Sequence, residues 1–137
     1  MTVDIRPFPR QGWDPLPGEG VVGVVGRVLV REDDFFVAQL RLTEHATIHE
    51  HAGEHDTIVA CIEGEGYTSV GEETVPLREE QQVRWPAGVP HRLWTEDSTM
   101  LARAGIQAAV RGGRLRTSWH VYNTMADVER ALDVLSG

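Results

Sequence analysis

The spacing of short strand-like runs along the middle of the chain is the strongest constraint on its fold. These runs are rich in β-branched and aromatic residues, and turn-forming residues separate them. Strands are predicted over Val21 to Val30, Phe35 to Leu42, Thr57 to Ile62, Tyr67 to Val70, Glu73 to Leu77, Gln82 to Trp85 and His91 to Thr95. So many short strands in one stretch indicate a small barrel or sandwich.

The second run has the clearest alternation. Phe36, Ala38, Leu40 and Leu42 share one face, and the polar Gln39 and Arg41 lie on the other. This period of two is typical of a half-buried strand.

Both ends of the chain differ from this middle part. Residues 4–20 hold Pro7, Pro9, Pro15 and Pro17, which predicts an extended arm because proline supplies no ladder donor. Near the other end Thr124 precedes Asp127 in capping-box spacing, and Met125, Val128, Leu132 and Leu135 recur at helical intervals, so a helix is predicted from about Met125 to Leu135. With 137 residues, one compact unit is expected: a barrel with its arm over 1–107 and a strand-plus-helix extension over 108–137.

Composition excludes several classes of function. All thirteen basic residues are arginine, so no lysine can form an aldimine with pyridoxal phosphate or hold a phosphate in a P-loop. The net charge of −8 argues against nucleic-acid binding. Cys61 is the single cysteine, which rules out an internal disulfide and fits a reducing, cytoplasmic setting. The proline-containing start does not read as a signal peptide, and no membrane-spanning segment is expected.

Histidines cluster in one segment. His45, His49, His51 and His55 lie within eleven of the 137 residues. On a strand, His49 and His51 leave the same face and can converge on one point, as a metal ion requires. The segment WPAGVPH then delivers His91 from a rigid turn to the start of another strand.

The segment HEHAGEHDTIVACIEGEG, followed by WPAGVPHRLWT, resembles the two motifs of the cupin family. The likeness covers about residues 21 to 107. It implies an all-β jelly-roll barrel (a double-stranded β-helix), with His49, His51 and His91 as metal ligands. It also implies a homodimer, because exposed edge strands need covering and the arm could cross to a partner.

The first motif departs from the family where a glutamate is expected, and the loop there is about two residues longer. Three completions of the site stay open. His55 has the parity of Thr57 and is favoured, Asp56 could swing in from the loop, or water could fill the remaining positions. The alternative without a metal is that the histidines are surface residues of a barrel that binds no metal ion.

Several other residues are candidates for roles around the metal. Glu50, Asp56 and Tyr67 could move protons. Tyr67, Trp85, Leu93 and Cys61 could line a pocket, although plain core packing is the better reading for each, and Cys61 is expected to be a buried small hydrophobe. His45 is a possible ligand or neighbour of a ligand, and His120 is expected to be a polar residue of the tail.

A second resemblance lies at the end of the chain. Residues 101–135 are similar to the last part of class V aminotransferases and cysteine desulfurases, in which the arginine that corresponds to Arg116, ahead of Ser118, helps hold a substrate carboxylate. Because the rest of that enzyme is missing, no activity is carried over. Arg114 and Arg116 are expected at the surface or at an interface.

The sequence therefore predicts a cupin that binds one divalent metal ion (Fe, Mn, Ni, Co, Cu or Zn) and acts on a small molecule. An enzyme is expected, either an iron-type dioxygenase or a non-redox isomerase or lyase. The alternatives are a small-molecule sensor or a barrel with a structural metal.

Overall fold

The computed structural model describes residues 2–16, 18–107, 110–111 and 114–115. Within these residues the chain is all β and contains no helix, so none could cross a membrane. The strands are β1 (Asp14–Pro15), β2 (Val21–Arg31), β3 (Phe35–His51), β4 (Thr57–Val70), β5 (Glu73–Arg78), β6 (Gln82–Trp85), β7 (His91–Trp94), β8 (Met100–Gln107), β9 (Val110–Arg111) and β10 (Arg114–Leu115).

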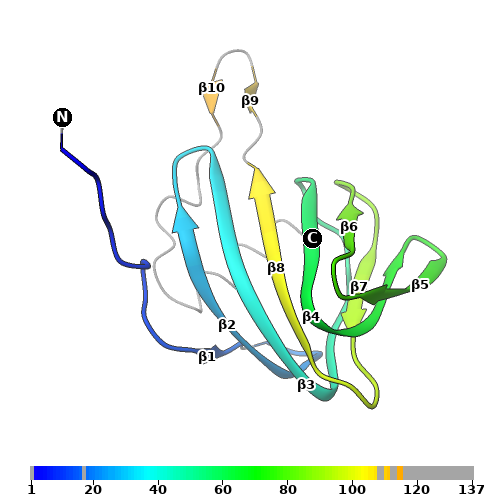
Figure 1. The fold of residues 1–137 in the computed structure, drawn as a ribbon. Helices are drawn as coiled ribbons and strands as arrows, with labels where there is room; N and C mark the ends of the chain where they lie inside the picture. Colours follow the sequence, from blue (N-terminus) through cyan, green and yellow to red (C-terminus); the bar gives the residue numbers. More distant parts are fainter. Residues whose placement is uncertain (1, 17, 108–109, 112–113, 116–137) are drawn as a thin grey trace.

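Two long strands close the sheet into a barrel. Both β3 and β4 pair with β7 at one end and with β8 at the other, so the path β3–β7–β4–β8 returns to its start. Figure 1 shows β3 running the length of the barrel between β2 and β8. The outer strands β2, β5 and β6 extend this ring, and β1 adds two residues beyond β2. The expected all-β barrel is thus confirmed.

The core is built from inward-facing residues of β3, β8 and β4 that stand opposite one another. Ala38 pairs with Ala104, which pairs with Val59, and all three are buried. The predicted alternation in β3 is also confirmed, because Phe36, Ala38, Leu40 and Leu42 are each no more than 1% exposed. Small alanines alternate with larger side chains, which lets the two walls of the barrel approach each other.

Strand β4 differs from the prediction. The sequence indicates two strands, Thr57 to Ile62 and Tyr67 to Val70, but the structure has one continuous strand with a register shift between Cys61 and Glu63. Gly64 has a φ of +82°, and a Cβ there would collide with the backbone carbonyl of Thr99, just before β8. The glycines between the two runs therefore bend the strand instead of ending it.

A bulge in β3 interrupts its pairing with β2. Val22 pairs with Thr47, and two residues further along β2 Val24 pairs with Leu42. The buried Thr95 stabilises this bulge, because its hydroxyl donates to the Thr43 carbonyl at 2.5 Å and accepts from the Ala46 amide at 3.0 Å.

The N-terminal arm is extended, as predicted, and runs outside β2 away from the barrel (Figure 1). Trp13 fixes its inner end, since the guanidinium groups of Arg27 and Arg41 lie 4.5 Å and 4.4 Å from its ring. Leu16 then enters the core and donates its amide to the Val24 carbonyl.

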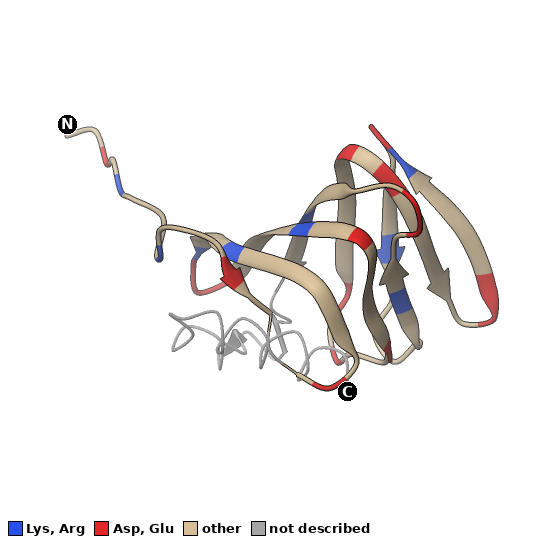
Figure 2. Cartoon of the chain, turned by 90° about the horizontal axis from the view of Figure 1, so that it is seen from below, with Lys and Arg blue, Asp and Glu red and all other residues tan. Residues whose placement is uncertain are grey.

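Charged residues cover the outside of the barrel. In the view of Figure 2, acidic residues gather at turns and strand ends, and the arginines are distributed over several strands. The predicted helix from Met125 to Leu135, His120 and Arg116 lie outside the described residues. Of the extension, the structure describes the small hairpin of β9 and β10, which includes Arg114.

Candidate functional site

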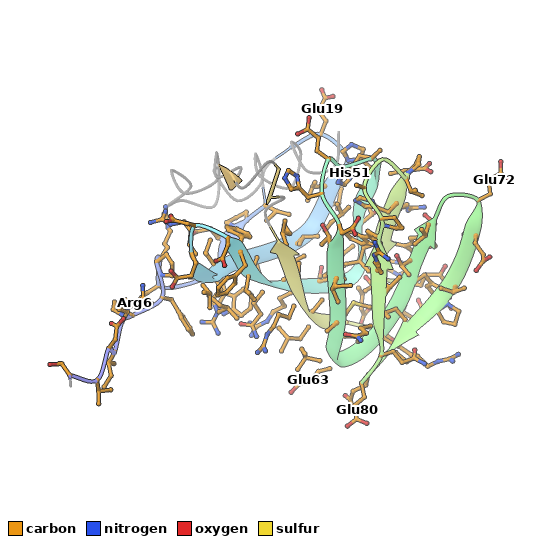
Figure 3. All side chains as sticks on the ribbon, turned by 90° about the horizontal axis from the view of Figure 1, so that it is seen from above. Arg6, Glu19, His51, Glu63, Glu72 and Glu80 are labelled. Carbon is orange, nitrogen blue, oxygen red and sulfur yellow. The ribbon has the colours of Figure 1, made fainter. Side chains whose placement is uncertain are left out.

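A second bulge in β3 brings His51 opposite His91. Ile48 pairs with Leu93 and His51 pairs with His91, so three steps along β3 match two steps along β7. The extra residue reverses the alternation of β3 and turns His51 toward the side of the buried Leu93. As a result the rings of His51 and His91 lie 4.9 Å apart, at 62° to each other. Figure 3 shows His51 at the same end of the barrel as Glu19, with Glu63 and Glu80 at the opposite end.

His91 is held in a buried setting. It is 2% exposed, and the indole of Trp85 lies almost parallel to its imidazole, with 4.1 Å between the ring centroids and 9° between the planes. Burial is the main cause that lowers the pKa of His91 to about 4, and the neighbouring His51 adds to the shift. The imidazole is therefore neutral near pH 7, which is the state in which histidine binds metals.

Backbone contacts assign the ring nitrogens of both histidines. Nδ1 of His51 lies 2.5 Å from the His49 carbonyl oxygen, and Nδ1 of His91 lies 3.1 Å from the Val89 carbonyl oxygen. Because a carbonyl oxygen can only accept, each Nδ1 carries a proton, and in the neutral imidazole of His91 Nε2 keeps its lone pair. This is the tautomer that a metal ligand needs.

His49 lies beside this pair. Its ring centroid is 5.3 Å from that of His51, and its side chain is exposed. The backbone amide of His49 donates to the Gly20 carbonyl at 3.1 Å, and a Cβ at Gly20 would collide with the His49 ring. Gly20, with a φ of +78°, thus forms the surface on which His49 rests.

His55 and Asp56, in the loop after β3, differ in burial and in their contacts. His55 is half-buried, and its Nδ1 atom is buried. Asp56 is exposed, and both of its carboxylate oxygens are occupied: Oδ1 accepts from the Ala87 amide at 2.8 Å, and Oδ2 pairs with Arg84. The Ala87 bond, followed by Arg84, lowers the pKa of Asp56. Asp56 therefore ties the loop to the WPAGVPH turn.

The donor set fits a divalent metal of intermediate softness. Neutral imidazoles suit Zn, Cu, Fe and Ni, and the rings of His51 and His91 lie 4.9 Å apart with each Nδ1 next to a backbone carbonyl. In the part of the chain that the structure describes, no three His, Cys, Asp or Glu side chains already stand in the arrangement of a metal site. His51 and His91 thus lie ring to ring, and the exposed His49 lies beside His51 with 5.3 Å between their ring centroids.

The other candidates lie elsewhere. Glu50 is exposed on β3 between His49 and His51. Tyr67 lies on the face of β4 opposite to the buried Thr68, where its ring stacks on Trp94 at 5.8 Å. His45 is exposed, with Nε2 lying 3.5 Å from Asp97.

Three of the four residues expected to line a pocket or pack in the core are core residues. Leu93, Trp85 and Cys61 are buried in the core. The prediction that Cys61 is a small buried hydrophobe is confirmed, and burial raises the pKa of its thiol. Trp85 combines core packing with direct contact to His91.

Sequence reasoning missed two residues that shape the site, Gly20 and Thr68. Thr68 is 0% exposed and accepts a hydrogen bond from Nε1 of Trp85 at 3.0 Å. A threonine within a strand-like run carries no signal of such a role. Gly20 follows Pro17 and Gly18 in a turn-like segment, so it reads as a loop residue until its contact with His49 is seen.

Comparisons with known proteins agree with this architecture. Residues 37–103 match the Cupin_2 family model, described as a Cupin domain. No curated protein matches the chain.

Solved structures show the same fold at low identity. KdgF from Halomonas sp. superimposes with a TM-score of 0.64 at 15% identity, covering 71% of this chain and 87% of that protein. The polyketide cyclase RemF from Streptomyces resistomycificus gives 0.68 at 13% identity, covering 98% and 96%. A predicted oxalate decarboxylase from Thermotoga maritima gives 0.56 at 17% identity, covering 61% and 79%. Residues 37–103 are thus similar to a Cupin domain, and these solved structures share the all-β fold of this chain.

Proposed function

We propose that this protein is a metal-dependent cupin enzyme that acts on a small molecule, with one divalent metal ion held by His49, His51 and His91. The observation that carries the proposal is the facing pair of His51 and His91, whose rings lie 4.9 Å apart with each Nδ1 directed at a backbone carbonyl. A neutral imidazole whose Nδ1 proton points at a backbone carbonyl is the form in which histidine usually binds a metal through Nε2, and His91 has this form.

The fourth position is assigned to His55 in this proposal. The bonds of Asp56 to Ala87 and Arg84 support this choice, because ligation by Asp56 would break both of them. Positions that protein side chains leave open would take water or substrate, which is the arrangement of a catalytic rather than a structural site.

The bound metal would supply a Lewis acid, or an oxygen-activating centre if it is iron. The chain's own groups would do the rest. His91 stays neutral and fixed in the core. The exposed Glu50, between His49 and His51 on β3, is a candidate to take up or release a proton. Descriptions of the similar structures range from a polyketide cyclase to a predicted oxalate decarboxylase, so the substrate class is given as a small molecule.

A homodimer is part of the proposal. The exposed Val3 and Ile5 project from the arm, at 76% and 86% exposure, and among the described residues β5 is an edge strand that pairs with β4 alone. Burying these groups against a second copy would remove apolar surface from water and cover an edge. Light scattering after gel filtration would give the mass in solution, and a mass of one chain would rule out the dimer.

The test of the metal site is elemental analysis of untagged protein by plasma mass spectrometry. The His49→Ala and His91→Ala variants are purified identically, with His45→Ala as the matched control, because His45 is an exposed histidine of the same strand that faces Asp97. We expect near-stoichiometric metal in the parent and in His45→Ala, and loss of metal in the other two variants. A parent that stays metal-free after incubation with ferrous, manganous, nickel and zinc ions would overturn the proposal. Iron would direct the next assays to oxygen consumption, and zinc, nickel or manganese to isomerase, lyase or hydrolase assays.

A further inference from the structure

The ring of His91 is constrained on two sides by the protein. On its face, Trp85 lies parallel at 4.1 Å, and at its edge Nδ1 meets the Val89 carbonyl oxygen at 3.1 Å. The stack fixes the plane of the imidazole, and the backbone contact fixes its rotation within that plane. The Nε2 edge is therefore directed without any contribution from a metal.

Trp85 is in turn held by a buried hydroxyl. Its Nε1 donates to Oγ1 of Thr68 at 3.0 Å, and the same hydroxyl donates to the Arg92 carbonyl at 2.9 Å. Both side chains are inaccessible to solvent, at 4% and 0% exposure, so water cannot replace these bonds. The chain of contacts crosses from β6 through β4 to β7, one residue past His91 itself.

We propose that Thr68 and Trp85 are positioning residues: the Thr68 hydroxyl sets the orientation of the Trp85 indole, and the indole holds the His91 imidazole in the plane required for metal binding. This inference rests on the proposed metal site for its consequence, but the orientation of the ring can be measured without metal. Outer contacts of this kind typically change metal affinity by about 10-fold to 100-fold.

The experiment compares Thr68→Val, which removes the hydroxyl at nearly constant volume, with Thr68→Ser, which retains it. Thr95→Val is the matched control, because Thr95 is another buried threonine with two hydrogen bonds, but its partners are Thr43 and Ala46. Each protein is examined without metal by imidazole ¹H–¹⁵N correlation spectroscopy. Each is then titrated with Co²⁺, following its visible d–d bands, and its thermal midpoint is recorded.

In the metal-free parent we expect the His91 ring protons to be shifted upfield by the Trp85 ring current. Thr68→Val should reduce this shift, weaken Co²⁺ binding at least about 10-fold and alter the d–d bands, and Thr68→Ser should restore all three. Thr95→Val should lower the thermal midpoint and leave the ring shifts and the Co²⁺ spectrum at parent values.

Two results would separate the two proposals. If Thr68→Val lowers the thermal midpoint but keeps the His91 shifts and the Co²⁺ spectrum of the parent, Thr68 serves stability alone and the positioning role is wrong. If the parent binds no Co²⁺ while Thr68→Val still releases the His91 ring, the metal site is wrong and the orientation of the ring by Thr68 and Trp85 stands. Trp85→Phe, which keeps an aromatic face without the N–H donor, should reproduce the Thr68→Val ring shifts in part, and parent shifts in this variant would also overturn the positioning role.

Discussion

The Asp56 carboxylate accepts a hydrogen bond from the backbone amide of Ala87 at 2.8 Å, across 31 positions of sequence. A second bond, from the Gly88 amide to the Gly53 carbonyl at 2.6 Å, runs beside it. The longer loop after β3 is thereby joined to the turn that delivers His91. Asp56, the alternative candidate for the metal, thus links the loop after the first motif to the turn of the second.

Removal of this carboxylate should loosen the junction. We expect Asp56→Ala to lower the free energy of unfolding by about 1 kcal/mol, within the range for a hydrogen bond to a charged group that is partly exposed. Asp56→Asn should cost less, because its amide oxygen can still accept from Ala87. Urea unfolding of the three proteins measures the difference, with Asp97→Ala as a control at a 95% exposed carboxylate. Equal stability of Asp56→Ala and the parent would contradict the role of the junction.

The bulge at residues 43–46 should depend on the Thr95 hydroxyl. Thr95→Val leaves the buried Ala46 amide and the part-buried Thr43 carbonyl without this partner, so we expect a loss of about 1–3 kcal/mol in the free energy of unfolding. Thr95→Ser, which keeps the hydroxyl, should recover most of it. Denaturant titrations that place both variants at the parent midpoint would show that the bulge is stable by itself.

A side chain at position 20 should disturb His49. Gly20→Ala combines a strained φ of +78° with a collision against the His49 ring, whereas Gly12→Ala has a φ of +89° and open space around it. Both variants should therefore lose about 1 kcal/mol of stability from the backbone. We expect weaker metal binding in Gly20→Ala alone, measured by calorimetric titration with Zn²⁺. The same affinity in both variants would contradict the contact between Gly20 and His49 as a support of the site.

Burial of Cys61 should make its thiol unreactive and make stability fall at alkaline pH. Desolvation raises its pKa above the usual value of 9.0, so the unfolded chain loses this proton at lower pH than the folded chain does. The contribution of Cys61 is thus fully present below pH 9 and decreases as the pH rises from there. Ellman's reagent should react far more slowly with native protein than with protein in urea, and Cys61→Ala should flatten the decline of stability above pH 9. Rapid labelling of the native thiol would contradict its burial.

Periodicity was enough to predict the barrel wall, because burial forces alternation. Phe36 and Leu40 follow a period of two that is visible in the sequence, and both lie in the core. The histidine pair was harder, since the predicted strand ended at Leu42, whereas β3 continues to His51, and His49 and His51 were expected to share a face on a regular strand. The structure inserts an extra residue between Ile48 and His51, so the parity of His51 changes before it reaches His91.

Contacts between distant strands explain the rest of what the sequence could not predict. Stacking of Trp85 on His91 depends on β6 and β7 each pairing with β4, which no local pattern specifies. The same holds for Thr68, whose partners are 17 and 24 positions away. For Asp56, the sequence left a role as ligand open behind the favoured His55, and it carries no signal of the bonds to Arg84 and Ala87.

The closure of the ring by β8 also sets the order of events during synthesis. Residues 35–42 of β3 and 57–64 of β4 both pair with β8, which is synthesised after them. On the ribosome these two strands, with Phe36 and Val59 among their apolar residues, have open sides until Gln107 has left the exit tunnel. The barrel is therefore expected to complete its folding after translation of this region and at a rate limited by distant pairing. Slower expression at reduced temperature should raise the soluble yield, because it gives β3 and β4 time to pair with β8 of their own chain. Pairing with strands of other nascent chains, which leads to aggregation, then becomes less frequent.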